Sequence, residues 1–224
     1  METEINVKRE SKGSHIKALF LYLFIFYLVW AFKELWLVKY IYLYDETTSA
    51  LLMAIIKIFV WIVPTCLWIK YYLHINPINY LKMNVHVKRG LFWGVVLSLI
   101  LGLRFAFEVY ILHHQRFHFD LSLTSYLNVF LLSGITEEIV FRGFILQEIG
   151  KKMSFWKANL ITAFLFLVIH YAVWMYDGIF FDVWSHLYVY LLGLIFGFVY
   201  KKTGSLWSVV LLHSFHNLLI MISF

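Results

Sequence analysis

The chain consists of long hydrophobic runs separated by short polar segments. A helix needs about 20 mostly apolar residues to cross a bilayer, and seven runs meet this length, although a count of six or eight stays open. They lie at about 17–44, 50–73, 90–113, 121–150, 155–176, 184–201 and 206–224. Because hydrophobic residues follow one another instead of alternating with polar ones, the pattern predicts helices and not the strands of a barrel.

Composition supports this interpretation. Hydrophobic residues make up 62% of the 224 residues, whereas soluble domains contain about 45–50%. We therefore expect an all-α, polytopic helical bundle in the cell membrane. In a soluble protein a formal net charge of +6 would suggest a nucleic-acid partner, but here the basic residues fall between the hydrophobic runs and indicate membrane topology instead.

Lysine and arginine are distributed unevenly between the two ends of the predicted bundle. With seven spans and the N-terminus inside, the inside segments hold thirteen of them and the outside segments hold only Arg116. The thirteen are Lys8, Arg9, Lys12, Lys17, Lys70, Lys82, Lys88, Arg89, Lys151, Lys152, Lys157, Lys201 and Lys202. Basic residues collect on the cytoplasmic side of membrane proteins, so we expect the N-terminus inside and the C-terminus outside.

The same pattern divides the chain into three parts. Residues 1–16 form a polar tail, 17–120 hold three spans, and 121–224 hold four spans.

Lys33 and Glu34 interrupt the first run; we expect them to snorkel to the membrane interface, with an inward-facing pair as the alternative. Gly193 and Gly197 form a small-residue face that allows close helix packing, which we expect inside the molecule, although a dimer contact stays open.

The fourth run contains two adjacent carboxylates and an arginine, Glu137, Glu138 and Arg142. An ionised side chain at membrane depth costs about 2.5–3.5 kcal/mol on insertion scales, so it persists where it pairs, lines a wet cavity or performs chemistry. On a helix, Glu138 and Arg142 are four residues apart and can pair, whereas Glu137 points about 100° away. We therefore expect Glu137 to be unpaired and functional.

Three further polar residues lie inside later runs, namely His170, His213 and Asn217. Glu137, His170 and His213 each lie eleven to fourteen residues from the nearest inside lysine, which corresponds to about 16–21 Å along a helix. We expect the three to meet at one depth, with Asn217 on the same face as His213 and His216 beside it as a supporting partner. The alternative is a set of interhelical hydrogen bonds, each worth about 0.6–2 kcal/mol.

These residues form three ordered motifs, each on its own hydrophobic run. The motifs are EExxxR (Glu137, Glu138, Arg142), FxxxH (Phe166, His170) and HxxxN (His213, Asn217). In this order they resemble the CPBP family of intramembrane proteases, also described as Abi-like. This family comprises type II CAAX prenyl endopeptidases and bacterial relatives linked to bacteriocin processing and self-immunity. The resemblance covers about residues 121–224.

The resemblance implies a glutamate-dependent endopeptidase that acts on a membrane-associated or lipidated peptide or lipoprotein. Glu137 would activate a water molecule that His170 orients, and His213 with Asn217 would stabilise the oxyanion. Glu138, Arg142, Phe166 and His216 would support these groups. We expect the site to open towards the cytoplasmic side, with access from the outer leaflet as the alternative.

Several alternatives stay open at this point. Glu137, His170 and His213 could instead hold a zinc ion with water as the fourth ligand; we favour a site without metal, because Glu138, already paired, would then be the only base. The function could also be non-proteolytic bacteriocin immunity or binding, or acyl or amide transfer at the same site. The sequence identifies no substrate, cleavage position, partner protein or oligomeric state.

Overall fold

The computed structural model describes the backbone of residues 2–223 and the side chains of residues 15–223. All regular structure in this part of the chain is helical, so the predicted all-α fold is confirmed. The side chains of Lys8, Arg9 and Lys12, which the topology prediction used, lie outside the described residues. The elements, with π-helical segments marked η, are α1 (Glu2–Phe32), η1 (Lys33–Leu37), α2 (Val38–Ile41), α3 (Glu46–Lys57), η2 (Ile58–Ile62), α4 (Val63–Leu67), η3 (Trp68–Tyr72), α5 (Pro77–Tyr80), α6 (Val87–Ala106), η4 (Phe107–Leu112), η5 (Ser125–Ser133), α7 (Gly134–Glu138), η6 (Ile139–Ile145), α8 (Leu146–Gly150), α9 (Phe155–Ile169), α10 (Tyr171–Tyr176), α11 (Val183–Thr203) and α12 (Leu206–Ser223).

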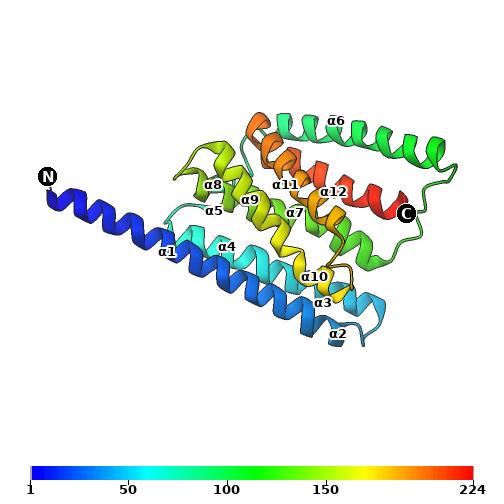
Figure 1. Cartoon of the computed structure of the whole chain (residues 1–224), viewed down its shortest axis with the longest axis horizontal. Coiled ribbons are helices and arrows are strands. Elements are labelled where there is room, and N and C mark those ends of the chain that lie inside the picture. Colours follow the sequence, from blue (N-terminus) through cyan, green and yellow to red (C-terminus); the bar gives the residue numbers. More distant parts are fainter. Residues whose placement is uncertain (1, 224) are drawn as a thin grey trace.

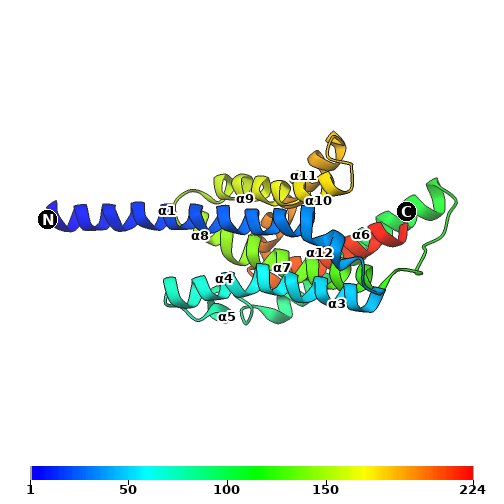
Figure 2. The ribbon, with the colours of Figure 1, turned by 90° about the horizontal axis from the view of Figure 1, so that it is seen from below.

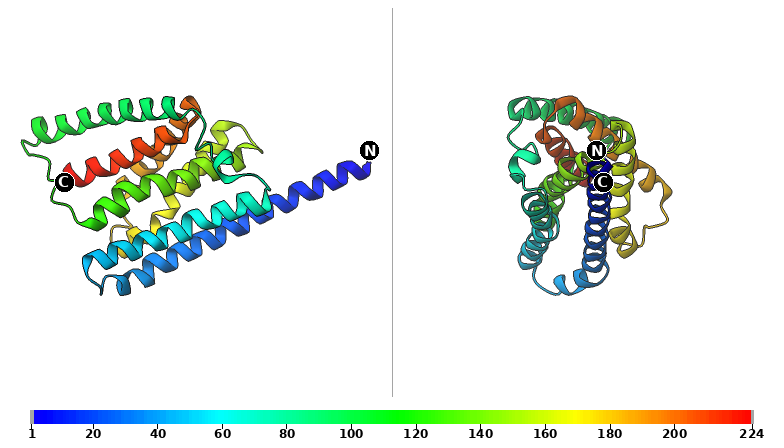
Figure 3. Two further views of the ribbon diagram at one scale, coloured as in Figure 1. Left: turned by 180° about the vertical axis from the view of Figure 1, so that it is seen from behind. Right: turned by 90° about the vertical axis from the view of Figure 1, so that its left-hand side faces the viewer.

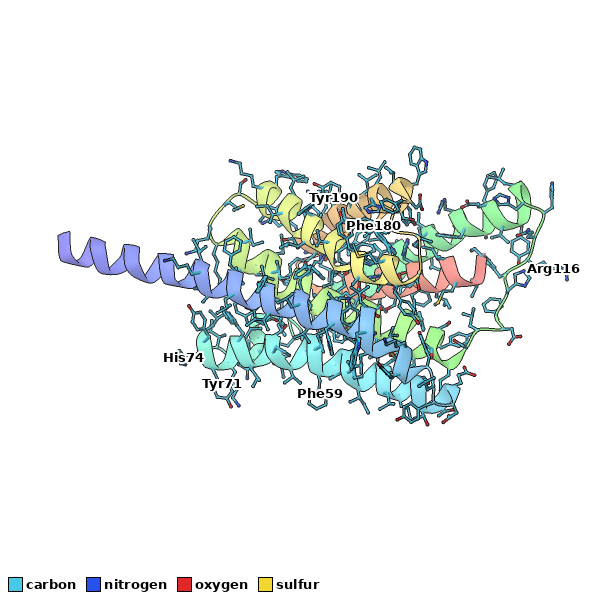
Figure 4. The ribbon with its side chains drawn as sticks, turned by 60° about the horizontal axis from the view of Figure 1, so that its bottom comes forward. Phe59, Tyr71, His74, Arg116, Phe180 and Tyr190 are labelled. Carbon is cyan, nitrogen blue, oxygen red and sulfur yellow. The ribbon has the colours of Figure 1, made fainter. Side chains whose placement is uncertain are left out.

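Six helical stretches are long and apolar enough to cross a membrane. They are His15–Ile41, Glu46–Tyr72, Val87–Leu112, Phe155–Tyr176, Val183–Thr203 and Leu206–Ser223. Many of their large apolar side chains point outwards, as Phe59 and Tyr71 do in Figure 4, each 63% exposed. Such an apolar surface is stable in contact with lipid and unfavourable in contact with water. The protein is therefore a multi-pass integral membrane protein, as predicted.

The continuous run from η5 to α8, called the central helix below, lies at the centre of the bundle. Every residue from Thr136 to Leu146 is buried, and Figures 1 and 3 show α7 enclosed by other helices. α12 packs along α6 on one side and along η5 and α7 on the other, while α9 packs against α11 and α8. The charged motif of this run therefore contacts protein instead of lipid.

The bundle has two chemically different ends. Figures 1 and 2 show the segments 73–86, 150–154 and 203–205 towards the end from which the N-terminus projects. The segments 42–45, 113–124 and 177–182 lie at the opposite end together with the C-terminus. Arg116 marks this second end in Figure 4, far from Tyr71 and His74. Exposed lysines flank the first end, among them Lys151, Lys152, Lys201 and Lys202.

The small-residue face of α11 packs inside the molecule. Gly193 and Gly197 are both buried against α9. A Cβ atom on Gly193 would lie 3.0 Å from the Cβ and 3.1 Å from the Cα of Ala163, and one on Gly197 would collide with Asn159. The predicted internal packing is confirmed, and it brings the backbone of α11 close to the central helix.

We predict that Gly193→Val lowers stability by about 1–3 kcal/mol, because its side chain must displace the backbone of α9. Gly102→Val is the matched control, since a Cβ at Gly102 meets nothing within 4 Å and both changes carry the same helix propensity cost. Thermal unfolding of both variants in detergent measures the difference. Equal melting temperatures would show that the close approach of α9 and α11 contributes nothing.

Candidate active site

A polar cavity of about 400 Å³ lies between five parts of the bundle. Its walls come from the α1–α2 region, from α3 and η2, from η5 and α7, from α9 and α10, and from α12. Glu137, His170, His213 and Asn217 all line it. The structure thus brings together the four residues that the sequence selected, while their catalytic roles stay predictions.

Glu138 and Arg142 form a fully buried ion pair. The Arg142 Nη1 donates to Glu138 Oε1 at 2.8 Å, and both side chains are 0% exposed. The Arg142 Nη2 donates to the carbonyl oxygen of Gly193 at 3.0 Å, and the guanidinium lies 4.5 Å from the centroid of the Phe166 ring. The expected pairing is confirmed, and Arg142 joins the central helix to both α9 and α11.

His213 connects the two glutamates. Its Nδ1 donates to Glu138 Oε1 at 2.7 Å, and its Nε2 lies 3.9 Å from Glu137 Oε2. Because a carboxylate accepts and does not donate, Nδ1 carries the proton, and Nε2 of the neutral ring is an acceptor. Glu138 therefore fixes the tautomer and orientation of His213 as well as holding Arg142. The spacing of the sequence motifs did not predict this contact.

His170 is fixed in a similar way by its own helix. Its Nδ1 donates to the carbonyl oxygen of Phe166, four residues earlier, at 2.7 Å. This bond leaves Nε2 of the neutral ring as a hydrogen-bond acceptor. The ring of Phe166 packs edge-on against His170, with 4.9 Å between centroids, and against His213 at 5.8 Å. Phe166 thus holds both imidazoles and the guanidinium of Arg142 in position.

Glu137 is paired, which corrects the expectation that its carboxylate is free. The Lys57 Nζ lies 3.3 Å from Glu137 Oε1, and both side chains are 10% exposed. Lys57 also donates to the hydroxyl of Ser133, which donates to the carbonyl oxygen of Asn128 at 3.0 Å. The pairing arises because α3 packs against η5 and η2 packs against α7, so an ammonium group from the second span reaches the central helix.

Sequence reasoning missed Lys57 although a signal was present. Lys57 lies in the middle of an apolar run and has no acidic residue three or four positions away. A lysine at this depth needs a carboxylate on another helix. The sequence therefore indicated that Lys57 has a distant partner, but it did not say which one.

Lys33 and Glu34 form a second buried pair at the cavity. The Lys33 Nζ donates to Glu34 Oε1 at 2.9 Å, and the ammonium lies 4.7 Å from the centroid of the Trp30 ring. Both residues line the cavity and are less than 10% exposed. The expectation that they snorkel to the interface is wrong, because η1 turns this face of the first span towards α10.

Asn217 is oriented by a chain of hydrogen bonds that starts at α11. The Tyr188 hydroxyl lies 2.6 Å from His216 Nε2, and His216 Nδ1 lies 3.3 Å from Asn217 Oδ1. With a proton on Nδ1, the tyrosine donates to Nε2 and the imidazole donates to the amide oxygen. The amide nitrogen then donates to the carbonyl oxygen of Val129 at 3.1 Å. His216 contacts Asn217 and Tyr188, while its supporting role stays a prediction.

The donor set does not fit a divalent cation. Zinc would need Glu137, His170 and His213 as ligands around one point. The positive ammonium of Lys57 lies against the carboxylate that such an ion would share. Among the described residues, no group of three histidine, cysteine or acidic side chains is arranged as a ligand set. No step proposed below uses a metal.

The cavity opens at the end opposite to the lysines. Its lining is buried at Trp61, Glu137 and His213 and becomes exposed at Tyr42 and Tyr176, which are 51% and 43% exposed. These two residues adjoin the segments 42–45 and 177–182. The lining contains no residue of the segments 73–86, 150–154 and 203–205, so the expectation of an opening at the lysine-rich end is wrong.

Comparison with known protein families finds a match. Residues 119–219 match the family model described as type II CAAX prenyl endopeptidase Rce1-like. No curated protein and no solved structure matches the chain. The residues of the three motifs all fall within the matched stretch, whereas Lys33, Glu34 and Lys57 fall outside it.

We predict that Glu138→Gln destabilises the protein by about 3–5 kcal/mol, because it leaves the buried Arg142 without its charge partner. The control is Glu108→Gln, in the Arg104–Glu108 pair, whose side chains are 56% and 23% exposed; it should cost about 1 kcal/mol or less. Thermal unfolding in detergent compares the two. A similar loss in both variants would contradict a central role for Glu138.

Proposed function

Residues 119–219 of this chain belong to the type II CAAX prenyl endopeptidase Rce1-like family, and from this premise we propose that the protein is an intramembrane endopeptidase. It hydrolyses a peptide bond in a membrane-associated or lipidated peptide. One observation carries the proposal: the Glu137 carboxylate lines a buried cavity together with His170 and His213, whose orientations are fixed by hydrogen bonds.

Glu137 acts as the general base. A water molecule in the cavity donates hydrogen bonds to the Glu137 carboxylate and to Nε2 of His170. As its oxygen attacks the peptide carbonyl carbon, one proton passes to Glu137 and the other stays on the oxygen. The Lys57 ammonium, 3.3 Å away, stabilises the negative charge of Glu137 and keeps the carboxylate in its ionised form in an apolar surrounding. Positioned general bases contribute about 10²–10⁴-fold to such rates.

His213 and Asn217 stabilise the oxyanion. The Asn217 amide nitrogen supplies one donor. Nε2 of His213, 3.9 Å from Glu137 Oε2, supplies another when it carries a proton. A donor of this kind contributes about 2.7–4 kcal/mol. Glu137 then returns its proton to the leaving amine, which breaks the carbon–nitrogen bond and restores the base.

We extend the proposal to topology and domain organisation. The central run 121–150 acts as a seventh span in addition to the six apolar helices, with the N-terminus inside and the C-terminus outside. The lysine-rich end of the bundle supports this orientation. Residues 121–224 form a catalytic core of four spans, and the first two of the three spans within 17–120 supply Lys57 and part of the cavity wall.

We predict that Glu137→Gln abolishes cleavage while the protein still inserts and folds, because the amide is nearly isosteric but accepts no proton. Comparative proteomics of cells carrying the wild type and the variant should reveal a membrane peptide that stays unprocessed. Mass spectrometry of the product distinguishes addition of water from transfer to an amine. Full processing by Glu137→Gln would rule out the mechanism.

We predict that Lys57→Met lowers the cleavage rate about ten- to hundredfold, because a hydrogen bond to a charged group contributes about 1.5–3 kcal/mol and about 1.4 kcal/mol changes a rate tenfold. Lys57→Arg should recover part of the activity. Lys39→Met is the control, since Lys39 is exposed and lies over the rings of Trp36 and Tyr40. Wild-type activity in Lys57→Met would contradict its role beside Glu137.

A further inference from the structure

We propose that the cavity receives its substrate from the extracytoplasmic side, so that the protein acts on peptide segments presented at the outer face of the membrane. That the cavity binds a substrate rests on the proposed function, whereas the direction of access follows from the structure of the bundle. The substrate class is a lipidated or membrane-anchored peptide whose cleaved segment lies outside.

The first observation is that the cavity is closed towards the lysine-rich end. From Glu137 towards the lysine-rich end, the central helix continues with Phe141, Phe144 and Ile145, all 0% exposed. Trp61 is 1% exposed and packs edge-on against Phe141, with 6.0 Å between ring centroids. These side chains belong to the main hydrophobic core, which fills the bundle between the site and that end.

The second observation is that three walls of the cavity continue in the other direction. Beyond the buried charged groups, the lining runs along α2 to Tyr42, along η5 to Thr124, and along α10 to Tyr176 and Asp177. Tyr42, Tyr176 and Asp177 are exposed. The path into the cavity towards Glu137 therefore begins among the segments 42–45, 113–124 and 177–182.

The third observation is the distribution of charge on the two ends. The closed end is flanked by exposed lysines of three separate segments, Lys70, Lys151, Lys152, Lys201 and Lys202 among them. At the open end the segments 42–45, 113–124 and 177–182 hold Arg116 as their single lysine or arginine, together with Asp45, Asp120, Asp177 and Asp182. Basic segments stay on the cytoplasmic side. The open end of the cavity is therefore the extracytoplasmic end.

The depth of the site constrains the substrate further. Glu137 lies twelve residues after Ser125, the first residue of η5, which is at most about 18 Å along a helix. An extended peptide covers about 3.3–3.6 Å per residue. The substrate peptide must therefore extend about five or six residues inwards from the outer interface to reach Glu137. A lipid or a transmembrane anchor on the outer side would hold the peptide at the required depth.

Thiol labelling of the full-length protein in intact cells tests the direction of access. Cys66 is the single cysteine of the chain, so Cys66→Ser provides a background without thiols. Three cysteines are then introduced one at a time: Tyr176→Cys at the proposed mouth, Ser133→Cys beside Lys57 inside the cavity, and Lys151→Cys at the lysine-rich end. Sulfonatoethyl methanethiosulfonate, a small charged reagent that does not cross membranes, is added outside.

We expect Tyr176→Cys and Ser133→Cys to react in intact cells, and Lys151→Cys to react only after the cells are opened. Two results would overturn the proposal. One is labelling of Lys151→Cys in intact cells, with Tyr176→Cys protected. The other is failure of Ser133→Cys to react from outside while Tyr176→Cys reacts, because the cavity would then not be open on that side. Gel filtration in detergent checks that each variant is folded.

Labelling requires no peptide cleavage, so the direction of access and the proposed hydrolysis fail independently. Proteomics of Glu137→Gln cells supplies the matching readout on substrates. The peptide bonds that stay uncleaved in the variant should lie in segments exported across the membrane. Unprocessed peptides confined to the cytoplasmic face would contradict outer access and leave the hydrolysis intact.

Discussion

The constraint on which the structure depends is that each charge placed at membrane depth needs a partner. Glu138 meets this requirement most fully, because one of its oxygens accepts hydrogen bonds from both Arg142 and His213. Arg142 in turn binds the backbone of α11 and lies over the ring of Phe166 on α9. One buried carboxylate thus positions the central helix against three others and orients an imidazole of the candidate site.

The same constraint explains why the first half of the chain is part of the site. Glu137 faces away from Arg142, so its charge is balanced by Lys57, which comes from α3. Lys33 and Glu34 from η1 complete the polar wall. The stretch that matches the Rce1-like family supplies the glutamates, histidines and asparagine, whereas the second span supplies the ammonium group beside Glu137. The chemistry of the cavity is therefore a joint property of both halves.

The arrangement also separates the two ends of the molecule. A dense aromatic and aliphatic core lies between the site and the lysine-rich end, and a polar opening leads to the other end. A hydrolase inside a membrane needs water at the scissile bond and lipid excluded from it. A cavity that opens on one side satisfies both requirements, and it also limits which side of the membrane can present the substrate.

The sequence by itself determined the helical class, the membrane location, six of the seven predicted spans, the Glu138–Arg142 pair and the residues that gather around one cavity. These features follow from the helical period of the polar residues and from the length and hydropathy of the hydrophobic runs, which are local properties of the chain. Only the tertiary structure decided that Lys57 pairs with Glu137, that His213 binds Glu138, that Lys33 and Glu34 face inwards, and that the cavity opens away from the lysines. Each of these depends on how helices rotate and pack against one another, which no spacing within a single helix specifies. Glu137 shows the difference, since its position could be read from the motif but its partner lies eighty residues away.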